Sequence, residues 1–226
     1  MNAIVRMENI QMLRKILKTL IPSKGDVFYD LFINGAKAVD DAADKLADII
    51  NTPDRSRCID LSKDLKELKK VSVNNHAKVL QELNCQFITP IDRGDIHQIS
   101  ALQIKLVNKI IKVNKKLQIY GIDVQVDDCL INAVNTLQMI TTCLMNIMCA
   151  MKNSNHNEIE MESNKISELD DKVSDDLVHA MKKIKDAQYD HLTIIKLKEI
   201  YKALESAIDT SETLCDTTMM VSVKAI

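Results

Sequence analysis

The sequence predicts an all-α protein made of a few long helices packed on one another. Glycine and proline, which turn or interrupt the backbone, number four and three in 226 residues. Aromatic residues make up 3% of the chain and tryptophan is absent, so strand-favouring side chains are scarce. Apolar residues recur at helical spacing through most of the chain. The many tight turns of a β or α/β fold are therefore not expected.

The first expected element is an amphipathic segment at residues 1–25, which ends at a break over 22–25. Its apolar face is flanked by basic side chains. Such a segment is able to contact an anionic membrane surface peripherally or to pack on the helices that follow, and both interpretations stay open. The apolar residues are Ile10, Leu13, Leu17 and Leu20, and the basic ones are Arg14, Lys15 and Lys18.

A long helix is expected over 26–50 and a second over 52–84. Thr52 is a residue type that caps helices, and Pro53 suits the first helical position, so the second helix is predicted to start there. Three aspartates fall away from the apolar stripe of the first helix and are expected to face solvent: Asp40, Asp44 and Asp48.

The third helix is predicted to start within the segment FITPIDRGDI and to run to about residue 120. Thr89 is a candidate N-cap, with Pro90 in the first turn and Asp92 three residues later as the acid of a capping box. Alternatively Asp92 itself caps the helix, with Asp95 at its third position. In either case Gly121 is expected to end the helix.

Three further helices are expected over 126–152, 158–186 and 192–223, with a polar loop over 153–157. The stretch 129–151 is uncharged and long enough to span a bilayer. It also contains amide side chains that are costly in hydrocarbon, so we expect a buried helix of a bundle and not a transmembrane one. The amides are Asn132, Asn135, Gln138 and Asn146.

Six long helices divide naturally into two sets of three. We therefore expect an N-terminal amphipathic segment over 1–25, a first three-helix bundle over 26–122 and a second over 123–226. The helices within each bundle are expected to be long and antiparallel, and the two bundles to follow in tandem. The argument rests on helix count and length.

Charge and motifs limit the function classes. The chain has 30 basic and 32 acidic residues, a net charge of −2, which gives no electrostatic reason to expect nucleic-acid binding. It has none of the motifs GxxxxGK[ST], GxSxG or GxGxxG, and nothing places a nucleophile beside its acidic pairs. The sequence is therefore interpreted as that of a protein that is not an enzyme.

Four segments resemble the PhoU-like family of phosphate-transport accessory proteins. They are LIPSKGDVFYDLF at 20–32, FITPIDRGDI at 87–96, LQIYGI at 117–122 and KEIYKALESAID at 198–209. The resemblance implies two three-helix bundles in tandem. It also implies a cytoplasmic protein that works with a Pit-type inorganic phosphate transporter. The family signature lies at the corner between the second and third helices and is expected to be structural; its residues are Thr89, Pro90, Asp92 and Arg93.

The resemblance also implies paired acids that hold metal ions on adjacent helices. In the first bundle the matching positions carry no acid: they are Lys69, Val73, Gln103 and Val107. In the second bundle Asp170, Glu205 and Asp209 keep the acid, whereas Ser174 replaces the fourth. We expect no metal in the first bundle and at most one divalent or iron-type ion in the second, held by these three carboxylates. The alternative is a solvated acidic helix face.

The sequence thus favours a cytoplasmic regulator or accessory protein of inorganic phosphate transport, with a Pit-type transporter as its partner. Two alternatives stay open: a metal-binding or metal-sensing helical bundle, and a structural interaction scaffold without a ligand. Self-association is also left open.

Overall fold

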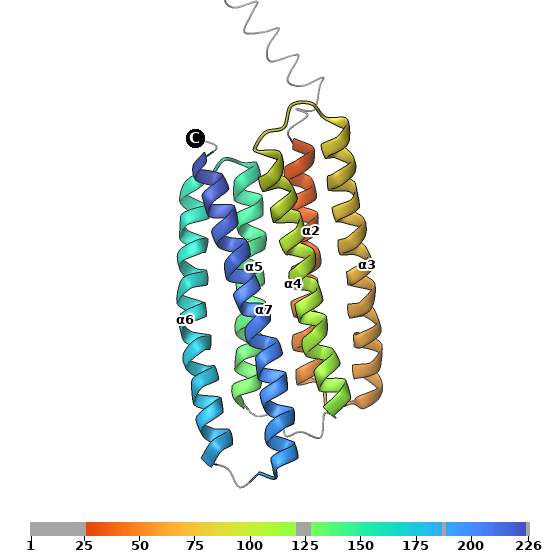
Figure 1. Cartoon of the computed structure of the whole chain (residues 1–226), viewed down its shortest axis with the longest axis vertical. Helices are drawn as coiled ribbons and strands as arrows, with labels where there is room; N and C mark the ends of the chain where they lie inside the picture. The colour runs from red at the N-terminus through yellow and green to blue at the C-terminus, as the bar shows by residue number, and fades with distance from the viewer. Residues whose placement is uncertain (1–25, 121–127, 187–188, 225–226) are drawn as a thin grey trace, which may run out of the picture.

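The computed structural model describes residues 26–120, 128–186 and 189–224 of the chain (Figure 1). The expected amphipathic segment 1–25 and Gly121 lie outside these residues. The described residues form helices and contain no strand, which confirms the all-α prediction. The helices are α2 (Asp26–Asn51), α3 (Arg55–Cys85), α4 (Arg93–Tyr120), α5 (Asp128–Lys152), α6 (His156–Asp186) and α7 (His191–Lys224).

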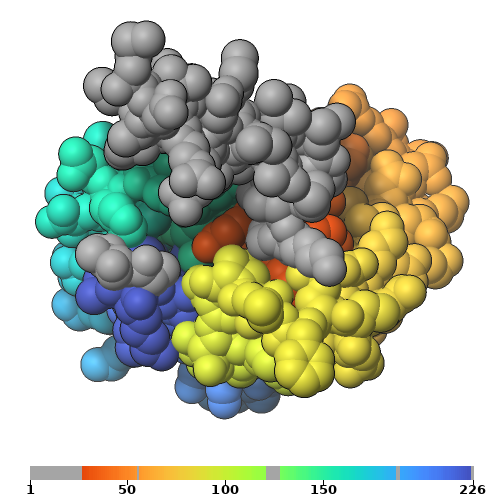
Figure 2. Space-filling model, turned by 90° about the horizontal axis from the view of Figure 1, so that it is seen from above, coloured from red at the N-terminus to blue at the C-terminus, as the bar shows by residue number. Residues whose placement is uncertain are grey.

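The long antiparallel helices form two triplets that lie side by side. Helices α2, α3 and α4 pack on one another, as do α5, α6 and α7. The triplets are joined because α2 packs on α5 and α4 packs on α7. Seen from above, α2 lies in the middle of the molecule, between α3 and α5 (Figure 2). A single cluster of buried apolar side chains runs through both triplets.

Helix α2 is enclosed on three sides, and its composition explains how. Between its large apolar side chains it carries small buried ones, including Ala36, Ala42 and Ala43, so neighbouring helices are able to approach closely. Gly35 is the extreme case, because an added β-carbon there would lie 1.9 Å from Oε1 of Gln103 on α4. Close packing at this point therefore requires glycine.

Helix α5 is the one described helix long and apolar enough to cross a membrane, but its most apolar window is 61% buried inside the protein. It packs on α2, α6 and α7. Two of its amides find partners in the bundle: Gln138 donates to Asp44 at 2.7 Å, and Asn146 donates to Glu162 at 3.3 Å. These are the contacts of a core helix, as the sequence predicts.

Asp44 and Asp48 are exposed, as predicted, whereas the prediction of a solvated position is wrong for Asp40, which is half-buried against α5. Asp40 accepts hydrogen bonds from the hydroxyls of Thr141 and Thr142, at 2.9 and 3.0 Å. Burial raises the pKa of Asp40 in spite of these two donors. Asp40 lies at the edge of the apolar stripe, where the hydroxyl groups of a neighbouring helix are able to cover it.

The predicted start of the second helix is also wrong. The hydroxyl of Thr52 donates to the carbonyl of Asp48 at 2.6 Å, so Thr52 belongs to the end of α2. Asp54 is the N-cap of α3 instead, and its carboxylate accepts the backbone N–H of Ser56 at 2.8 Å.

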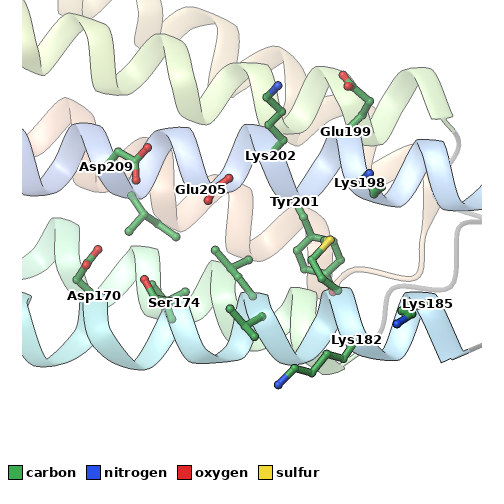
Figure 3. Close-up of a pocket in the computed structure, with 15 residues that line it drawn as sticks. Asp170, Ser174, Lys182, Lys185, Lys198, Glu199, Tyr201, Lys202, Glu205 and Asp209 are labelled. Atoms are coloured by element: carbon green, nitrogen blue, oxygen red, sulfur yellow. The ribbon is translucent and has the colours of Figure 1, made fainter.

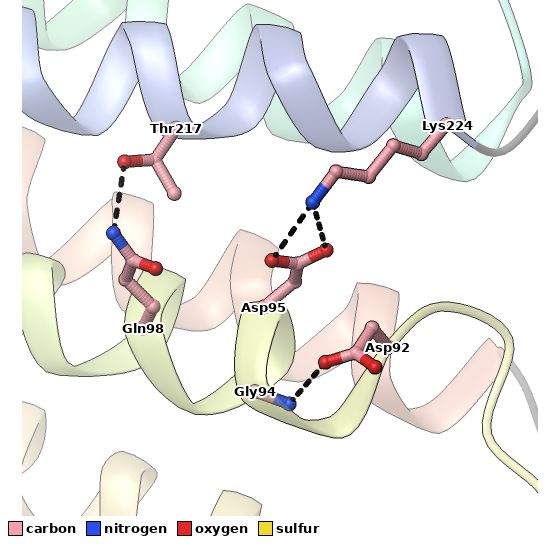
Figure 4. A network of polar contacts seen from close by, with 6 residues as sticks. All are labelled: Asp92, Gly94, Asp95, Gln98, Thr217 and Lys224. Carbon is pink, nitrogen blue, oxygen red and sulfur yellow. Dashed lines mark hydrogen bonds and ion pairs between the residues drawn. The ribbon is translucent and has the colours of Figure 1, made fainter.

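Helix α4 starts by the second of the two predicted arrangements. The Asp92 carboxylate accepts the backbone N–H of Gly94 at 2.7 Å (Figure 4). The Asp92 carbonyl accepts the N–H of Ile96 at 3.0 Å. Thr89 does not cap the helix, because its hydroxyl donates to the carbonyl of Ile91 at 2.8 Å. Pro90 accordingly lies before the helix and not in its first turn.

Arg93, the first residue of α4, binds the C-terminal end of α3. Its guanidinium donates to the carbonyl of Gln86 at 2.9 Å and to the carbonyl of Leu83, both at the C-terminal end of α3. A cation at a helix C-terminus complements the partial negative charge of the exposed carbonyls. Asp92 and Arg93 together thus give the signature segment the structural role that was expected of it.

Helices α6 and α7 both start before their predicted positions. Asn155 accepts the backbone N–H of Glu158 at 3.3 Å, so α6 starts two residues before the expected position. Asp190 accepts the N–H groups of Leu192 and Thr193 at 2.9 and 3.0 Å and thereby caps α7. In both cases the capping side chain immediately precedes the helix.

Candidate functional site

The candidate site is a groove between α6 and α7 with a volume of about 790 Å³. The two helices run antiparallel, so residues near the end of α6 lie opposite residues near the start of α7. Acidic side chains lie at one end of the groove and lysines at the other (Figure 3). The apolar floor between them consists of Val173, Leu177, Val178, Met181, Tyr201 and Ile208.

The acidic end contains all the residues that were predicted to hold a metal. Asp170 and Ser174 come from α6, and Glu205 and Asp209 come from α7. Burial raises the pKa of Asp170, and the charges of Asp209 and then Asp171 raise it further. Asp170 and Asp209 therefore face each other across the groove as like charges.

Glu212 belongs electrostatically to the same acidic end. Burial raises its pKa first, and Asp170 is the strongest of the four aspartates that raise it further. For both carboxyls burial is the larger cause of the raised pKa, and repulsion between neighbouring carboxylates adds to it.

The side chains predicted to hold a metal do not converge on one point. Among the residues that the structure describes, no three acidic, histidine or cysteine side chains converge closely enough to hold a metal ion. Asp170, Glu205 and Asp209 share the groove, but they do not form such a group in this conformation. Metal binding by these residues stays a prediction.

The basic end of the groove was missed by the sequence analysis. It consists of Lys182 and Lys185 on α6 and of Lys198 and Lys202 on α7. Spacings of three and four residues place each pair on one helix face, and this is the signal that could have found them. Glu199 also lines this end, but it accepts a hydrogen bond from Lys116 of α4 at 2.7 Å.

In the first triplet the positions that match the family's acids do not come together. Lys69 and Val73 are exposed on α3, whereas Gln103 and Val107 are buried on α4. Gln103 donates to the carbonyl of Phe32 on α2 at 2.8 Å. A buried amide that fixes α2 to α4 thus stands where the family resemblance implies a metal ligand.

A smaller hollow of about 470 Å³ lies between α2 and α3. Its acids are Asp41, Asp44, Asp48, Asp64 and Glu67. Lys45 lies among them, with its ammonium nitrogen 3.9 Å from a carboxylate oxygen of Asp64, and Asp44 is bonded to Gln138. The hollow is therefore interpreted as a charged surface between two helices.

The fold and the groove define a class of elongated proteins in which two antiparallel helix triplets lie side by side. No family model matches this chain, and no curated protein matches it in sequence. Solved structures do match. A PhoU-like protein from Shewanella oneidensis MR-1 superimposes with a TM-score of 0.75 at 11% identity, over 87% of this chain and 99% of that one.

A second structure from the same organism, described as a PhoU-like phosphate regulatory protein, has a TM-score of 0.74 at 11% identity with the same coverage. At this level of identity the likeness concerns the fold. The chain therefore has the PhoU-like fold, which the resemblance of its four sequence segments implied.

Proposed function

We propose that this protein is a non-catalytic regulator of inorganic phosphate transport that works in the cytoplasm with a Pit-type transporter. The observation that carries the proposal is the match of nearly the whole chain to the fold of a structure described as a phosphate regulatory protein. The resemblance of segments 20–32 and 87–96 to transport accessory proteins supports it independently.

The groove supports binding over catalysis. Its described ionisable residues are carboxylates, lysines and a tyrosine, and the set includes no histidine or cysteine to act as a nucleophile or as a base near neutral pH. In the proposed role the protein acts by docking a helix face on the cytoplasmic side of the transporter. The basic residues of segment 1–25 would add attraction to the anionic membrane surface beside it.

Phosphate uptake tests the proposal directly. Cells that lack this chain are compared with cells that carry it, using radiolabelled phosphate and, as a control, a labelled amino acid. A change confined to phosphate uptake is the expected result. Equal uptake of phosphate in both strains, at low and at high external phosphate, would refute a regulatory role.

Affinity purification from native membranes in mild detergent tests the partner. The tagged chain is expected to recover a phosphate transporter, and a tagged helical bundle of similar size and charge serves as the control. Recovery of the transporter with both baits, or with neither, would count against docking. The uptake experiment would still report on regulation by another route.

A metal-binding bundle is the second candidate, and the raised pKa of Asp170 favours it. A cation at the acidic end would neutralise like charges that now repel one another. Elemental analysis of protein purified without chelators should then find one ion per chain. The ion should be lost in a variant with Asp170→Asn, Glu205→Gln and Asp209→Asn.

A variant with Asp175→Asn and Glu168→Gln is the matched control, because both acids are exposed on α6 and neither lines the groove. Two or more tightly held ions per chain would mean that the ligands lie elsewhere. A protein without metal under every loading condition would leave the third reading, a scaffold with a solvated acidic face.

A further inference from the structure

We propose that the α6–α7 groove is the surface through which two copies of this chain associate about a two-fold axis. The groove has an acidic end, a lysine end and an apolar floor between them (Figure 3). When two such faces meet with their grooves antiparallel, each acidic end lies over the lysine end of the other copy. A second copy is thus the occupant whose charges match. This inference goes beyond the proposed function and does not depend on it.

The charges on α7 fit this arrangement in a single register. Lys198, Lys202, Glu205 and Asp209 all line the groove, and their spacing of four, three and four residues places them on one helix face. In an antiparallel pair of α7 helices, Lys198 lies opposite Asp209 when Lys202 lies opposite Glu205, because both pairs have the same midpoint. One alignment therefore satisfies all four charges.

Helix α6 fits the same symmetry. Asp170 and Lys185 lie at opposite ends of its groove face, and the midpoint between them falls at Leu177 and Val178. Val178 is 53% exposed although it lines the apolar floor. Across the proposed axis the two copies of Val178 meet at the centre, which removes an exposed apolar side chain from water.

The groove lysines form few interactions with acids of the same copy, the exception being Lys202, which adds to the effect of Lys116 in lowering the pKa of Glu199. Ion pairs between described residues include none with Lys182, Lys185, Lys198 or Lys202. Glu199 shows the contrast, because it lines the groove and is already paired with Lys116. At the acidic end, burial raises the pKa of Asp170, and the charges of Asp209 and Asp171 raise it further. Lysines of a second copy would supply the missing countercharge.

The dimensions indicate a protein partner and a weak association. Asp170 and Lys185 are fifteen residues apart, which corresponds to about 22 Å along a helix, so a small ligand does not reach both charged ends. Two helices side by side are about 20 Å wide, which gives each copy a contact footprint of about 450 Å². Stable complexes bury about 800 Å² per partner. The dimer should therefore depend on concentration and weaken with salt.

The test uses two complementary variants of the full chain, studied by sedimentation equilibrium. The first carries Lys198→Glu and Lys202→Glu, and the second carries Glu205→Lys and Asp209→Lys. In a dimer of either variant alone every α7 contact is between like charges, so association should weaken at least about tenfold. In a mixture of the two, opposite charges face again, and a dimer with one copy of each should form.

A variant with Lys66→Glu and Lys69→Glu on the exposed face of α3 is the control for net charge, and circular dichroism checks that all variants fold. If a charge-reversed variant unfolds, the same positions are changed to neutral Gln instead. The measurement is then the loss of association of that variant, without the mixing experiment. A wild-type chain that stays monomeric at every soluble concentration would overturn the proposal. So would variants that associate like the wild type, or a mixture that restores nothing.

Because these measurements use the purified chain alone, their failure is separate from that of the proposed function. A monomeric chain whose groove variants lose a transporter in affinity purification would place that partner in the groove instead.

Discussion

Gly35→Ala should destabilise the protein strongly, although alanine is the better helix former. The new β-carbon would lie 1.9 Å from Oε1 and 2.6 Å from Cδ of Gln103, and 3.1 Å from Nδ2 of Asn75. Gln103 is 1% exposed, so its amide has little room to move. Any movement also breaks its 2.8 Å hydrogen bond to the carbonyl of Phe32.

The magnitude follows from three contributions. Overpacking a core costs about 1–3 kcal/mol. A buried amide left without its partner costs about 1–3 kcal/mol. The replacement of glycine by alanine within a helix stabilises the folded state by about 1 kcal/mol, which offsets part of these costs. The net loss is about 3 kcal/mol near the middle of these ranges, which corresponds to a fall in Tm of about 6–12 °C for a chain of this size.

The decisive measurement is a double-mutant cycle with Gln103→Ala, followed by urea denaturation. Once the amide of Gln103 is gone, the nearest remaining contact of the new β-carbon is Nδ2 of Asn75 at 3.1 Å. Gly35→Ala should then cost much less than in the wild-type background, because the gain in helix propensity of about 1 kcal/mol offsets this contact. Asn34→Ala on the exposed side of α2 is the control for helix propensity alone. An equal effect of Gly35→Ala in both backgrounds would refute the explanation, as would an unchanged Tm in the wild-type background.

Three further predictions concern caps and titrating groups. Asp92→Ala should lower the free energy of unfolding, measured by urea denaturation, by about 1 kcal/mol, whereas Thr89→Ala should lower it by less than half of that. Equal losses for the two variants would contradict the assignment of Asp92 as the cap. In the folded protein burial raises the pKa of Asp170 above its ordinary value of 3.8, so the contribution of Asp170 to stability falls as the pH rises from there. Asp170→Asn should therefore raise Tm at pH 7 and lose this advantage near pH 3, and a lower Tm at pH 7 would show the sign to be wrong. Burial raises the pKa of Glu162, but hydrogen bonds from Lys165 and two other side chains outweigh it, and the net pKa is lowered. The stabilisation by Glu162 is present above the ordinary value of 4.5 and lost as the pH falls below it, so Glu162→Gln should flatten the acid limb of a Tm–pH profile.

Most of the fold could be predicted because it depends on local pattern. The apolar period and the scarcity of glycine and proline place the six helices of the described residues within a few residues of their observed bounds. The errors at Thr52 and Thr89 have one cause. A threonine hydroxyl is able to bond to a carbonyl of its own turn or of the preceding one, and the sequence does not say which bond forms.

The site could be predicted only where a residue type was distinctive. The acids of the groove were found because carboxylates at spacing i, i+4 stand out on a helix. The lysine end was missed because a lysine on a helix flank is typical of a solvated face, and only the packing of α6 on α7 brings Lys185 near Lys198. The contacts of Asp40 likewise depend on α5, which lies about a hundred residues away in the sequence.

Polar contacts join the start of α4 to the C-terminal part of α7. Lys224 donates to both carboxylate oxygens of Asp95, at 3.1 and 3.4 Å, and Gln98 donates to Thr217 at 3.5 Å (Figure 4). Beside these polar contacts, the apolar faces of α2 and α4 are covered by α5 and α7.

Helices α5 and α7, which cover α2 and α4, are synthesised after them. At a translation rate of about 5–20 residues per second, α7 is complete about 5–20 seconds after α4. Throughout that interval the nascent first triplet exposes to solvent the apolar surface that α5 and α7 later cover. Chaperones should therefore bind the nascent chain most strongly after α4 and before α7 has been synthesised. A stalled or truncated chain should be degraded by proteases and should not accumulate as a folded first triplet.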